Sequence, residues 1–376
     1  MDIDRADVVV IGGGVIGLAT AYFTLKEGKD VVLVDKGIPG WEASGRNGGW
    51  AAGHGLDIHD MKNAGFLREG IKIWQTLDEE LGAPTEFVKG GSLSIGFTEE
   101  EAWYLDKILE VCPKVGIEVK KVDLREMQEI IPGLHDRTLL GLFFPESGQA
   151  NPQLTCQAWV WGIKRLGGRV YQNTRVTGIN VQRDRVTGVE TTAGNIEGEQ
   201  VVNAAGPWSN VVNGMVGLSL PTEIILVEML CTEPAPPLTK ATFLGNVLYC
   251  RQAAHGHLHF GGFQTPSIDV RKSVNKPTSS LTTGDIARRF VELVPTTANI
   301  RVLRTWAGII EMVPDFTPIL GKAGYPGGYY LNVGYGGMGF SWSPIAGKMM
   351  SELLAKGKTS LGIEVLSPSR FYHSSD

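Results

Sequence analysis

Three of the chain's seven histidines stand at alternate positions in the segment "HGHLHFGG", residues 255–262. Side chains alternate along a strand, so His255, His257 and His259 would share one face, with apolar residues on the other. Histidines in this arrangement can bind a metal, move a proton or face solvent. No acid or cysteine lies within the segment to complete a metal site, and we predict none. Contact with a cofactor or substrate cavity is our first interpretation, and a solvent-facing polar surface is the alternative.

A glycine motif near the N-terminus is typical of a phosphate-binding turn. A β-branched run at 8–11 predicts a strand buried on both faces of a parallel sheet. Gly12, Gly14 and Gly17 follow in the spacing G-x-G-x-x-G. The first permits a tight turn, the second lets the backbone approach a pyrophosphate, and the third lets a helix pack closely on the strand. The N-terminus of that helix would offer free N–H groups to the phosphates.

An acidic residue follows the second strand of this unit. Helical spacing continues to Gly28, and a second buried apolar run at 31–34 ends in Asp35. A carboxylate at this place can accept both hydroxyls of an adenosine ribose, and it disfavours a 2′-phosphate. Strand, glycines, helix, strand and acid in this order predict a dinucleotide-binding unit. The motif alone does not separate NAD from FAD.

A second glycine-rich loop, "GWEASGRNGGW" at 40–50, follows directly. A nicotinamide-binding fold usually has a plain crossover there. Ser44 and Gly45 can bond phosphate, and Arg46 can offset its charge. The residues at 47–49 can lie against a flat ring. This loop therefore favours FAD.

These residues resemble the D-amino-acid oxidase–like flavoproteins, which include glycine oxidase, sarcosine oxidases and the flavin subunits of several amine dehydrogenases. "VVNAAGPWS" (201–209) is similar to the family's strand that returns to the cofactor, and the segment 331–357 to its C-terminal strand, loop and helix under the flavin. We expect that helix to begin with Ser343 as N-cap and Pro344 at its first position. The resemblance implies FAD held without a covalent bond. The residues it predicts to contact FAD are Gly12, Gly14, Val15, Ile16, Gly17, Asp35, Lys36, Ser44, Gly45, Arg46, Asn47, Gly48, Gly49, Val176, Ala204, Ala205, Gly206, Trp208, Gly308, Gly336, Gly337, Met338 and Gly339.

The resemblance also predicts an α/β fold with a Rossmann-like FAD-binding domain of the GR2 type and a discontinuous, mixed-sheet α+β substrate domain. We assign residues 1–85, 141–215 and 325–376 to the first, and 86–140 and 216–324 to the second.

Local patterns predict several elements of these domains. The segment 169–202 alternates apolar and polar residues and predicts a small antiparallel layer, and 245–263 predicts a hairpin. Capping boxes at Thr98…Glu101 and Asp123…Glu126 predict two amphipathic helices without chemical roles.

Two departures from the family bear on the reaction. Monomeric sarcosine oxidases have a lysine that helps reduced flavin react with oxygen. His259 stands nearest its place, and no lysine occurs between residues 241 and 271. Glycine oxidase–like members clamp the substrate carboxylate with an arginine after "WAG", where this chain has Ile310 followed by Glu311, and often with a second one near Gly337. The missing lysine and arginines weigh against a simple oxidase of glycine or D-amino acids.

The whole pattern resembles best the flavin-bearing β subunit of heteromeric proline, hydroxyproline, opine and sarcosine-type dehydrogenases. Such an enzyme transfers a hydride from a secondary amine to flavin N5, and the electrons leave through a second subunit, with or without a small third one. The alternatives are a self-sufficient oxidase that makes hydrogen peroxide and a flavin-binding scaffold without a substrate. The predicted catalytic residues are His257, His259, Glu311 and Tyr335, and the predicted substrate residues are His54, Arg251 and Ile310.

The cation that would hold a substrate carboxylate stays open. The candidates are Arg46, His54, Arg251, His257 and His259. Glu311 could face a cationic substrate tail, as in an arginine-derived opine, or could equally be a solvated acid at a strand end.

Composition excludes several other classes of function. The chain has 376 residues, 43% hydrophobic and 20% charged, with a formal net charge of −5. No Lys/Arg cluster is long enough for nucleic acid, and no apolar segment is long enough to span a bilayer. The N-terminal residues lack the positive charge of a signal peptide. The four cysteines form no C-x-x-C pair, so we expect buried, reduced thiols in a cytoplasmic protein.

Overall fold

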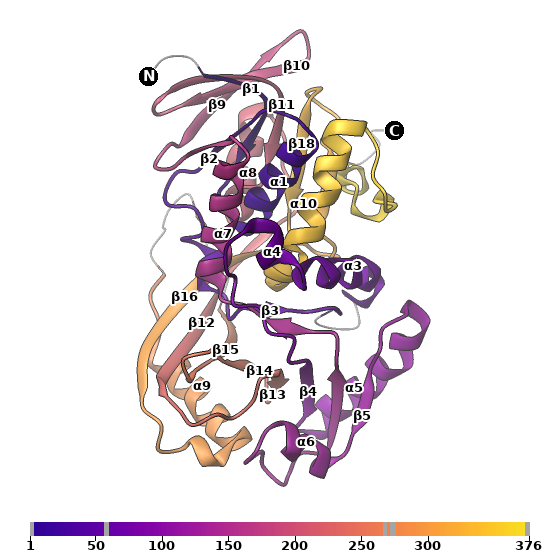
Figure 1. Cartoon of the computed structure of the whole chain (residues 1–376), viewed down its shortest axis with the longest axis vertical. Coiled ribbons are helices and arrows are strands. Elements are labelled where there is room, and N and C mark those ends of the chain that lie inside the picture. The colour runs from indigo at the N-terminus through magenta and orange to yellow at the C-terminus, as the bar shows by residue number, and fades with distance from the viewer. Residues whose placement is uncertain (1–3, 56–59, 266–268, 271–275, 373–376) are drawn as a thin grey trace.

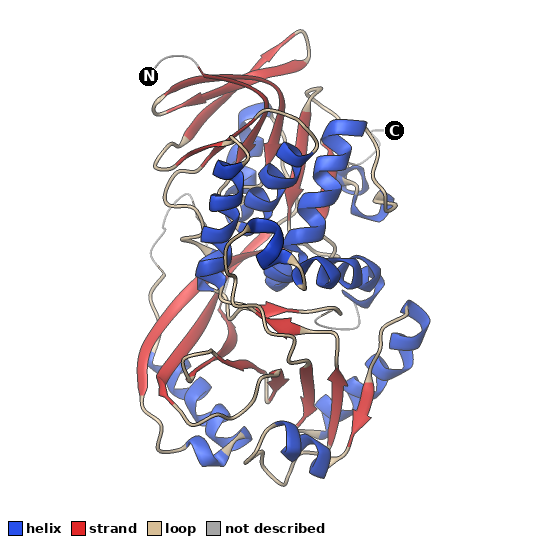
Figure 2. Ribbon diagram, viewed as in Figure 1, coloured by secondary structure: helices blue, strands red, loops and turns tan. Residues whose placement is uncertain are grey.

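The structure is a computed structural model that describes residues 4–55, 60–265, 269–270 and 276–372. Two large sheets divide the elongated molecule (Figures 1 and 2). The upper sheet and its helices come from both ends of the chain and from a central segment at 152–213, and the lower sheet comes from the two segments between them.

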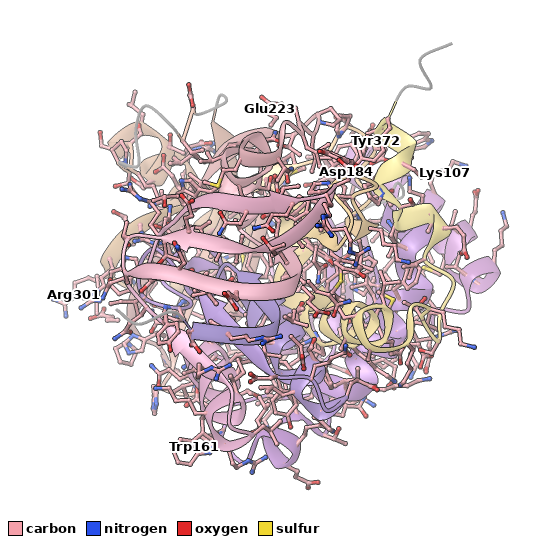
Figure 3. The ribbon with its side chains drawn as sticks, turned by 90° about the horizontal axis from the view of Figure 1, so that it is seen from above. Lys107, Trp161, Asp184, Glu223, Arg301 and Tyr372 are labelled. Carbon is pink, nitrogen blue, oxygen red and sulfur yellow. The ribbon has the colours of Figure 1, made fainter. Side chains whose placement is uncertain are left out.

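The upper sheet has the order β17-β18-β11-β1-β2-β8 and is parallel except for β17, which is antiparallel to β18. Beside it, β9 and β10 form an antiparallel layer with β11. This confirms the layer predicted at 169–202, and Figure 3 shows it from above with Asp184 at the turn between β9 and β10. The strands are β1 (Asp4–Ile11), β2 (Val31–Val34), β8 (Arg169–Tyr171), β9 (Val176–Gln182), β10 (Arg185–Thr191), β11 (Gly194–Asn203), β17 (Ile319–Lys322) and β18 (Tyr329–Val333).

Buried helices cover the upper sheet. Helix α1 is buried along ten successive residues, and the backbone of α10 approaches it so closely that a methyl group on Gly347 would lie 2.5 Å from the Ala19 carbonyl carbon. Trp159 of α7 packs edge-on against Tyr22 of α1. The helices of this half are α1 (Val15–Lys26), α2 (Ala43–Arg46), α3 (Ala64–Trp74), α4 (Leu77–Leu81), α7 (Pro152–Arg165), α8 (Ser209–Asn213) and α10 (Gly339–Lys356).

The predicted start of α10 is wrong. The helix begins at Gly339, with Met338 as N-cap, so Pro344 lies inside it. Proline cannot donate to the carbonyl four residues earlier. The hydroxyl of Ser343 donates to that carbonyl, on Phe340, at 2.9 Å. Ser343 and Pro344 therefore lie inside the helix, where the serine hydroxyl replaces the hydrogen bond that the proline cannot make, and they do not mark its start.

The lower sheet is mixed, with the order β16-β12-β15-β14-β13-β4-β6-β5. The helices α5 and α6 begin at the two predicted capping boxes, both of which are formed. The elements of this half are β4 (Ser92–Gly96), α5 (Glu99–Val111), β5 (Lys120–Val122), α6 (Leu124–Ile130), β6 (Leu140–Phe144), β12 (Glu223–Pro234), β13 (Thr242–Gly245), β14 (Leu248–Gln252), β15 (His257–Thr265), α9 (Ser280–Leu293) and β16 (Val302–Met312). A two-stranded sheet, β3 (Trp50–Ala51) with β7 (Gly148–Gln149), lies between the halves in Figure 1.

The predicted hairpin is confirmed as β14 and β15, and its two faces differ. Leu258 and Phe260 face the core beneath the sheet, where Phe260 stacks on Phe290 of α9 at 4.0 Å. His257 and His259 lie on β15, but His255 lies in the turn before it and is exposed. The three histidines therefore do not share one strand face, because the turn ends at Gly256.

The exact domain boundaries stay a prediction. Strand β17 falls within the segment predicted for the substrate domain, but it pairs with β18 in the upper sheet. We therefore propose that the last FAD-binding segment begins before Ile319.

Candidate flavin site

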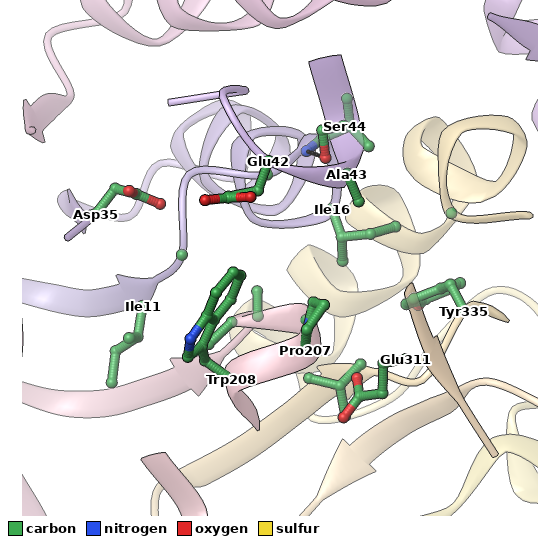
Figure 4. Close-up of a pocket in the computed structure, with 18 of the residues that line it drawn as sticks. Ile11, Ile16, Asp35, Glu42, Ala43, Ser44, Pro207, Trp208, Glu311 and Tyr335 are labelled. Atoms are coloured by element: carbon green, nitrogen blue, oxygen red, sulfur yellow. Dashed lines mark hydrogen bonds between the residues drawn. The ribbon is translucent and has the colours of Figure 1, made fainter. Parts of the chain in front are cut away.

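A long cavity runs along the carboxyl ends of β1, β2 and β11. Figure 4 shows Asp35 toward one end and Glu311 and Tyr335 toward the other, with Trp208 between them. The predicted cofactor residues that line it are Gly12, Gly14, Val15, Ile16, Asp35, Lys36, Ser44, Asn47, Val176, Ala204, Ala205, Gly206, Trp208, Gly336, Gly337 and Gly339.

The first glycine turn is shaped by close backbone contacts. Gly12 has a φ of +112°, and a methyl group there would lie 2.4 Å from the Ala204 carbonyl oxygen. A methyl group on Gly17 would lie 1.9 Å from the Gly12 carbonyl oxygen. Gly17 does not line the cavity, so it serves the close packing of helix and strand. Helix α1 then opens at the cavity with Gly14 as N-cap, which has no side chain to cap the N-terminal N–H groups.

Two charged residues occupy the ribose end. The Asp35 carboxylate accepts hydrogen bonds from the N–H groups of Gly13 and Gly37, each at 2.7 Å. These bonds fix its orientation and leave lone pairs for a ribose. The Lys36 ammonium lies 2.9 Å from the centre of the Trp208 ring. Burial lowers the pKa of Lys36 to about 8.

The second glycine loop connects the two halves of the molecule. Ser44 lies at the cavity and its hydroxyl accepts from the Val15 N–H at 3.0 Å. Arg46 points elsewhere, since its guanidinium donates to the carbonyls of Trp41 and Ala307. Its carbonyl accepts from the Trp306 indole at 2.8 Å. Arg46 therefore ties the loop to β16, and a phosphate contact for it stays a prediction without support from its bonds. Of the other predicted cofactor residues, Gly45, Gly48, Gly49, Gly308 and Met338 also lie outside the cavity wall.

Glu311 is a buried acid at the flavin end, only 4% exposed, so the interpretation as a solvated acid is wrong. Its carboxylate accepts from the Ser209 hydroxyl and from the Gly334 N–H. Burial raises the pKa of Glu311 to about 7, against the lowering effect of these bonds. Glu311 joins β16, α8 and the loop after β18, and Ile310 beside it also lines the cavity.

The Tyr335 hydroxyl is also buried, and it donates to the Asn332 side chain. The Asn332 amide in turn donates to Thr20 of α1 at 3.0 Å. These bonds give Tyr335 a structural position in the cavity wall. Its predicted catalytic role stays a prediction that its contacts do not support.

The hairpin β14–β15 carries the remaining predicted residues toward the second glycine loop. Arg251 and His259 are cross-strand partners, and Arg251 is close to Gly49. His259 contacts the Cys231 thiol of β12 at 3.8 Å, and burial lowers the pKa of His259 to about 3. The His257 ring is bonded to the Thr232 carbonyl at 2.7 Å.

His54 follows β3, just after this loop, and its ring is edge-on to that of Trp50. It is buried and stacks on Phe144 at 3.6 Å. Burial lowers its pKa to about 4. Both His54 and His259 are therefore uncharged at neutral pH.

Sequence reasoning missed three residues next to this face: Trp50, Gln149 and Tyr249. A signal for Tyr249 exists, because it is two residues before Arg251 and a strand repeats its face every two residues. Trp50 and Gln149 reach the face through tertiary contacts that no local pattern shows. Among the residues that the structure describes, no group of three metal-binding side chains occurs, and no helix is both long and apolar enough to cross a membrane. The described cysteines are free, and Cys231 is the one that is partly exposed.

Comparison with known proteins supports the interpretation of this cavity as an FAD site. The family model described as "FAD dependent oxidoreductase" (DAO) matches residues 7–353. The chain therefore belongs to the DAO family of FAD-dependent oxidoreductases, and the predicted family, fold class and cofactor are confirmed. Gly12, Gly17 and the start of α1, where the N-cap is a glycine, fit the pyrophosphate of FAD.

Individual relatives cover nearly the whole chain. A sarcosine oxidase β subunit from Rhodobacter capsulatus is 28% identical, covering 96% of this chain and 87% of the relative. The crystal structure of L-proline dehydrogenase from P. horikoshii superposes with a TM-score of 0.91 at 26% identity, covering 98% of each chain. That of glycine oxidase from Geobacillus kaustophilus has a TM-score of 0.90 at 25% identity, covering 98% of this chain and 100% of the other.

Proposed function

We propose that this chain is a cytoplasmic, flavin-bearing catalytic subunit of a heteromeric dehydrogenase that oxidises the C–N bond of a secondary amine or amino acid. The substrate class comprises opines, hydroxyproline, proline and sarcosine-like amines. Relatives named as sarcosine oxidase β subunits and as an L-proline dehydrogenase support this choice. Bound FAD, held without a covalent link, would supply the hydride acceptor.

The carrying observation is the position of His259, whose half-buried imidazole is on the residue directly across the hairpin from Arg251. Desolvation is the main cause of its low pKa of about 3, and the charges of Arg251 and His257 lower it further. Reduction of oxygen passes through the superoxide anion, which a nearby cation stabilises. By the family resemblance, His259 occupies the place of the lysine that has this role in monomeric sarcosine oxidases. An uncharged imidazole there favours an acceptor other than oxygen, and hence a partner subunit.

The chain's own residues contribute orientation and exclusion of water. On the face that meets the second glycine loop, Arg251 is buried and His259 is half-buried. A secondary amine held there in its neutral form would need no general base for the hydride step, because the nitrogen lone pair forms the C=N bond of an iminium ion as the hydride leaves carbon, and the N–H proton can pass to water afterwards. Buried neutral imidazoles favour the uncharged amine over its cation, since burial penalises charge.

A self-sufficient oxidase is the second candidate, and one observation favours it. Arg251 carries a positive charge directly across from His259 and could take the place of the missing lysine. The similarity to a glycine oxidase over nearly the whole chain also supports the oxidase.

Anaerobic reduction of the flavin tests the proposal. The purified chain would be mixed with octopine, nopaline, D- and L-proline, hydroxyproline, sarcosine, glycine and D-alanine while its visible spectrum is followed. Bleaching by a secondary amine, with slow recovery in air, supports the dehydrogenase. Bleaching by glycine or D-alanine with immediate recovery and stoichiometric peroxide establishes the oxidase. No bleaching by any amine, even with its partner subunit present, would leave a flavin-binding scaffold.

A further inference from the structure

Four buried polar atoms around the second glycine loop make no hydrogen bond within 3.5 Å among the described residues, and one of them, Tyr249 Oη, has the Trp50 backbone N–H near it, which leaves its own proton free to donate. They are Trp50 Nε1, His54 Nε2, Tyr249 Oη and Arg251 Nε. Because the Nδ1–H of the neutral His54 ring donates to the Gly55 carbonyl at 2.7 Å, its Nε2 is an acceptor. We call the other three residues, Trp50, Tyr249 and Arg251, the donor cluster. Buried polar groups in proteins are nearly always paired, so a concentration of unpaired ones indicates a bound ligand or water. We propose that the donor cluster binds the carboxylate of the substrate through Arg251 and Tyr249, in place of the arginines that this chain lacks. The inference rests on the proposed function and names the substrate class as amines that carry a carboxylate.

The burial of Arg251 requires a counter-charge. Its side chain is 6% exposed and donates one bond, from Nη1 to Gln149 Oε1 at 3.2 Å. No carboxylate of the described residues lies within 4.0 Å of it. Glu86 is the acid that influences Arg251 electrostatically, and its carboxylate already accepts from Asn151 at 3.0 Å. A buried guanidinium without an anion is costly, and a ligand carboxylate would remove that cost.

The hydroxyl of Tyr249 and the guanidinium of Arg251 are presented side by side. A methyl group on Gly48 would lie 2.3 Å from Tyr249 Oη, and one on the adjacent Gly49 would lie 3.2 Å from Arg251 Nε. Both donors therefore meet the same two-residue stretch of the loop that resembles the flavin-contacting loop of the family. A carboxylate can accept from a hydroxyl and a guanidinium together.

The other cations considered for this role have different partners or no charge. Arg46 is bonded to two backbone carbonyls, and both His54 and His259 have pKa values lowered by burial to about 4 and about 3. The donors of the cluster also suit an anion better than a cation. Trp50 Nε1 and the Arg251 guanidinium can donate hydrogen bonds but cannot accept them. Arg251 is therefore the buried side chain on the described part of this face that is positively charged at neutral pH.

Ligand binding without turnover tests the inference. The FAD-loaded chain would be titrated with cyclopentanecarboxylate and with its neutral isostere cyclopentanecarboxamide, following the flavin absorption bands. The carboxylate is expected to bind at least about 100-fold more tightly than the amide to the wild-type chain, as for a buried charge-assisted pair. The variant Arg251→Met should lose that preference and leave amide binding unchanged. Tyr249→Phe should weaken carboxylate binding by about tenfold, the worth of one hydrogen bond.

Arg304→Met is the matched control, because Arg304 is an exposed arginine on the same sheet. It should bind the carboxylate as the wild type does. Binding should also be constant from pH 6 to pH 9, since an arginine keeps its charge. A histidine cation would instead lose the ligand over this range as it deprotonates.

Three outcomes would overturn the inference: equal binding of acid and amide by the wild type, full carboxylate affinity in Arg251→Met, or loss of binding above pH 7. The wild-type comparison needs no variant, so it remains decisive if Arg251→Met does not fold. If the carboxylate binds through Arg251 and yet no amine bleaches the flavin, the proposed function fails while the binding site stands.

Discussion

Arg251 of β14 and His259 of β15 are direct cross-strand partners on the face of the lower sheet that meets the second glycine loop. Arg251 is buried and His259 is half-buried, but only the imidazole can respond to burial by losing its proton. Burial lowers the pKa of His259 to about 3, and the neighbouring guanidinium adds to this effect. The pair therefore places one permanent positive charge beside one neutral ring, next to the predicted flavin position.

A lysine in place of His259 should increase oxygen reactivity. His259→Lys adds a second cation where superoxide would form, and we expect the reduced flavin to reoxidise at least about tenfold faster in air. Stopped-flow absorbance of the prereduced protein measures this rate. His255→Lys places the same charge in the exposed turn before β15 and should leave the rate unchanged. An unchanged rate in His259→Lys would show that His259 does not control the reaction with oxygen.

The flavin turn should tolerate no side chain at its first glycine. Gly12→Ala combines a φ of +112° with a methyl group 2.4 Å from the Ala204 carbonyl oxygen. The turn would have to move, and we expect FAD affinity to fall by at least about 100-fold, comparable to the loss of a few kcal/mol. The flavin absorbance that remains after gel filtration reports this loss. Gly214→Ala is the control, since a methyl group at Gly214 meets no atom within 4 Å. Retention of FAD by Gly12→Ala would contradict the assignment of this turn.

Stability should fall as pH rises because of Glu311. Its pKa is raised from 4.5 to about 7, so the folded protein binds more protons than the unfolded chain between these values. The free energy of unfolding therefore decreases as pH increases through this window, by up to about 3 kcal/mol for this group. Glu311→Gln should remove that decrease, as measured by denaturant unfolding at pH 5 and pH 8.

The matched control for Glu311 is Glu223→Gln, at an exposed glutamate on β12. It should preserve the pH dependence of the wild type. A Glu311→Gln variant with the same pH dependence as the wild type would mean that Glu311 is ionised throughout, held by Ser209 and Gly334.

The sequence predicted best what short segments determine by themselves. The two buried strands, the glycine turn and both capping boxes depend on residues close together in the chain, and all of them form as expected. The family resemblance added the fold class and the cofactor.

Tertiary contacts decided what the sequence did not predict. Glu311 is buried because Ser209 and Gly334, from distant elements, close over it. Arg46 turns from the cavity because carbonyls of Trp41 and Ala307 are within its reach. The donor cluster likewise joins residues about 200 positions apart, Trp50 with Tyr249 and Arg251, so no spacing along the chain reveals it.

Replacing Ser343, which precedes the interior proline of α10, should cost more stability than replacing Ser351, which has no proline after it. Ser343→Ala would leave the Phe340 carbonyl without the hydroxyl that replaces the missing proline N–H, and we expect a loss of about 1–2 kcal/mol in the free energy of unfolding. Ser351 makes the same kind of bond, to the Lys348 carbonyl at 2.8 Å, where a helix N–H is also present. Ser351→Ala should therefore cost less than about 0.5 kcal/mol. Denaturant unfolding of the FAD-loaded variants measures both values, and equal losses would show that Ser343 does not compensate for Pro344.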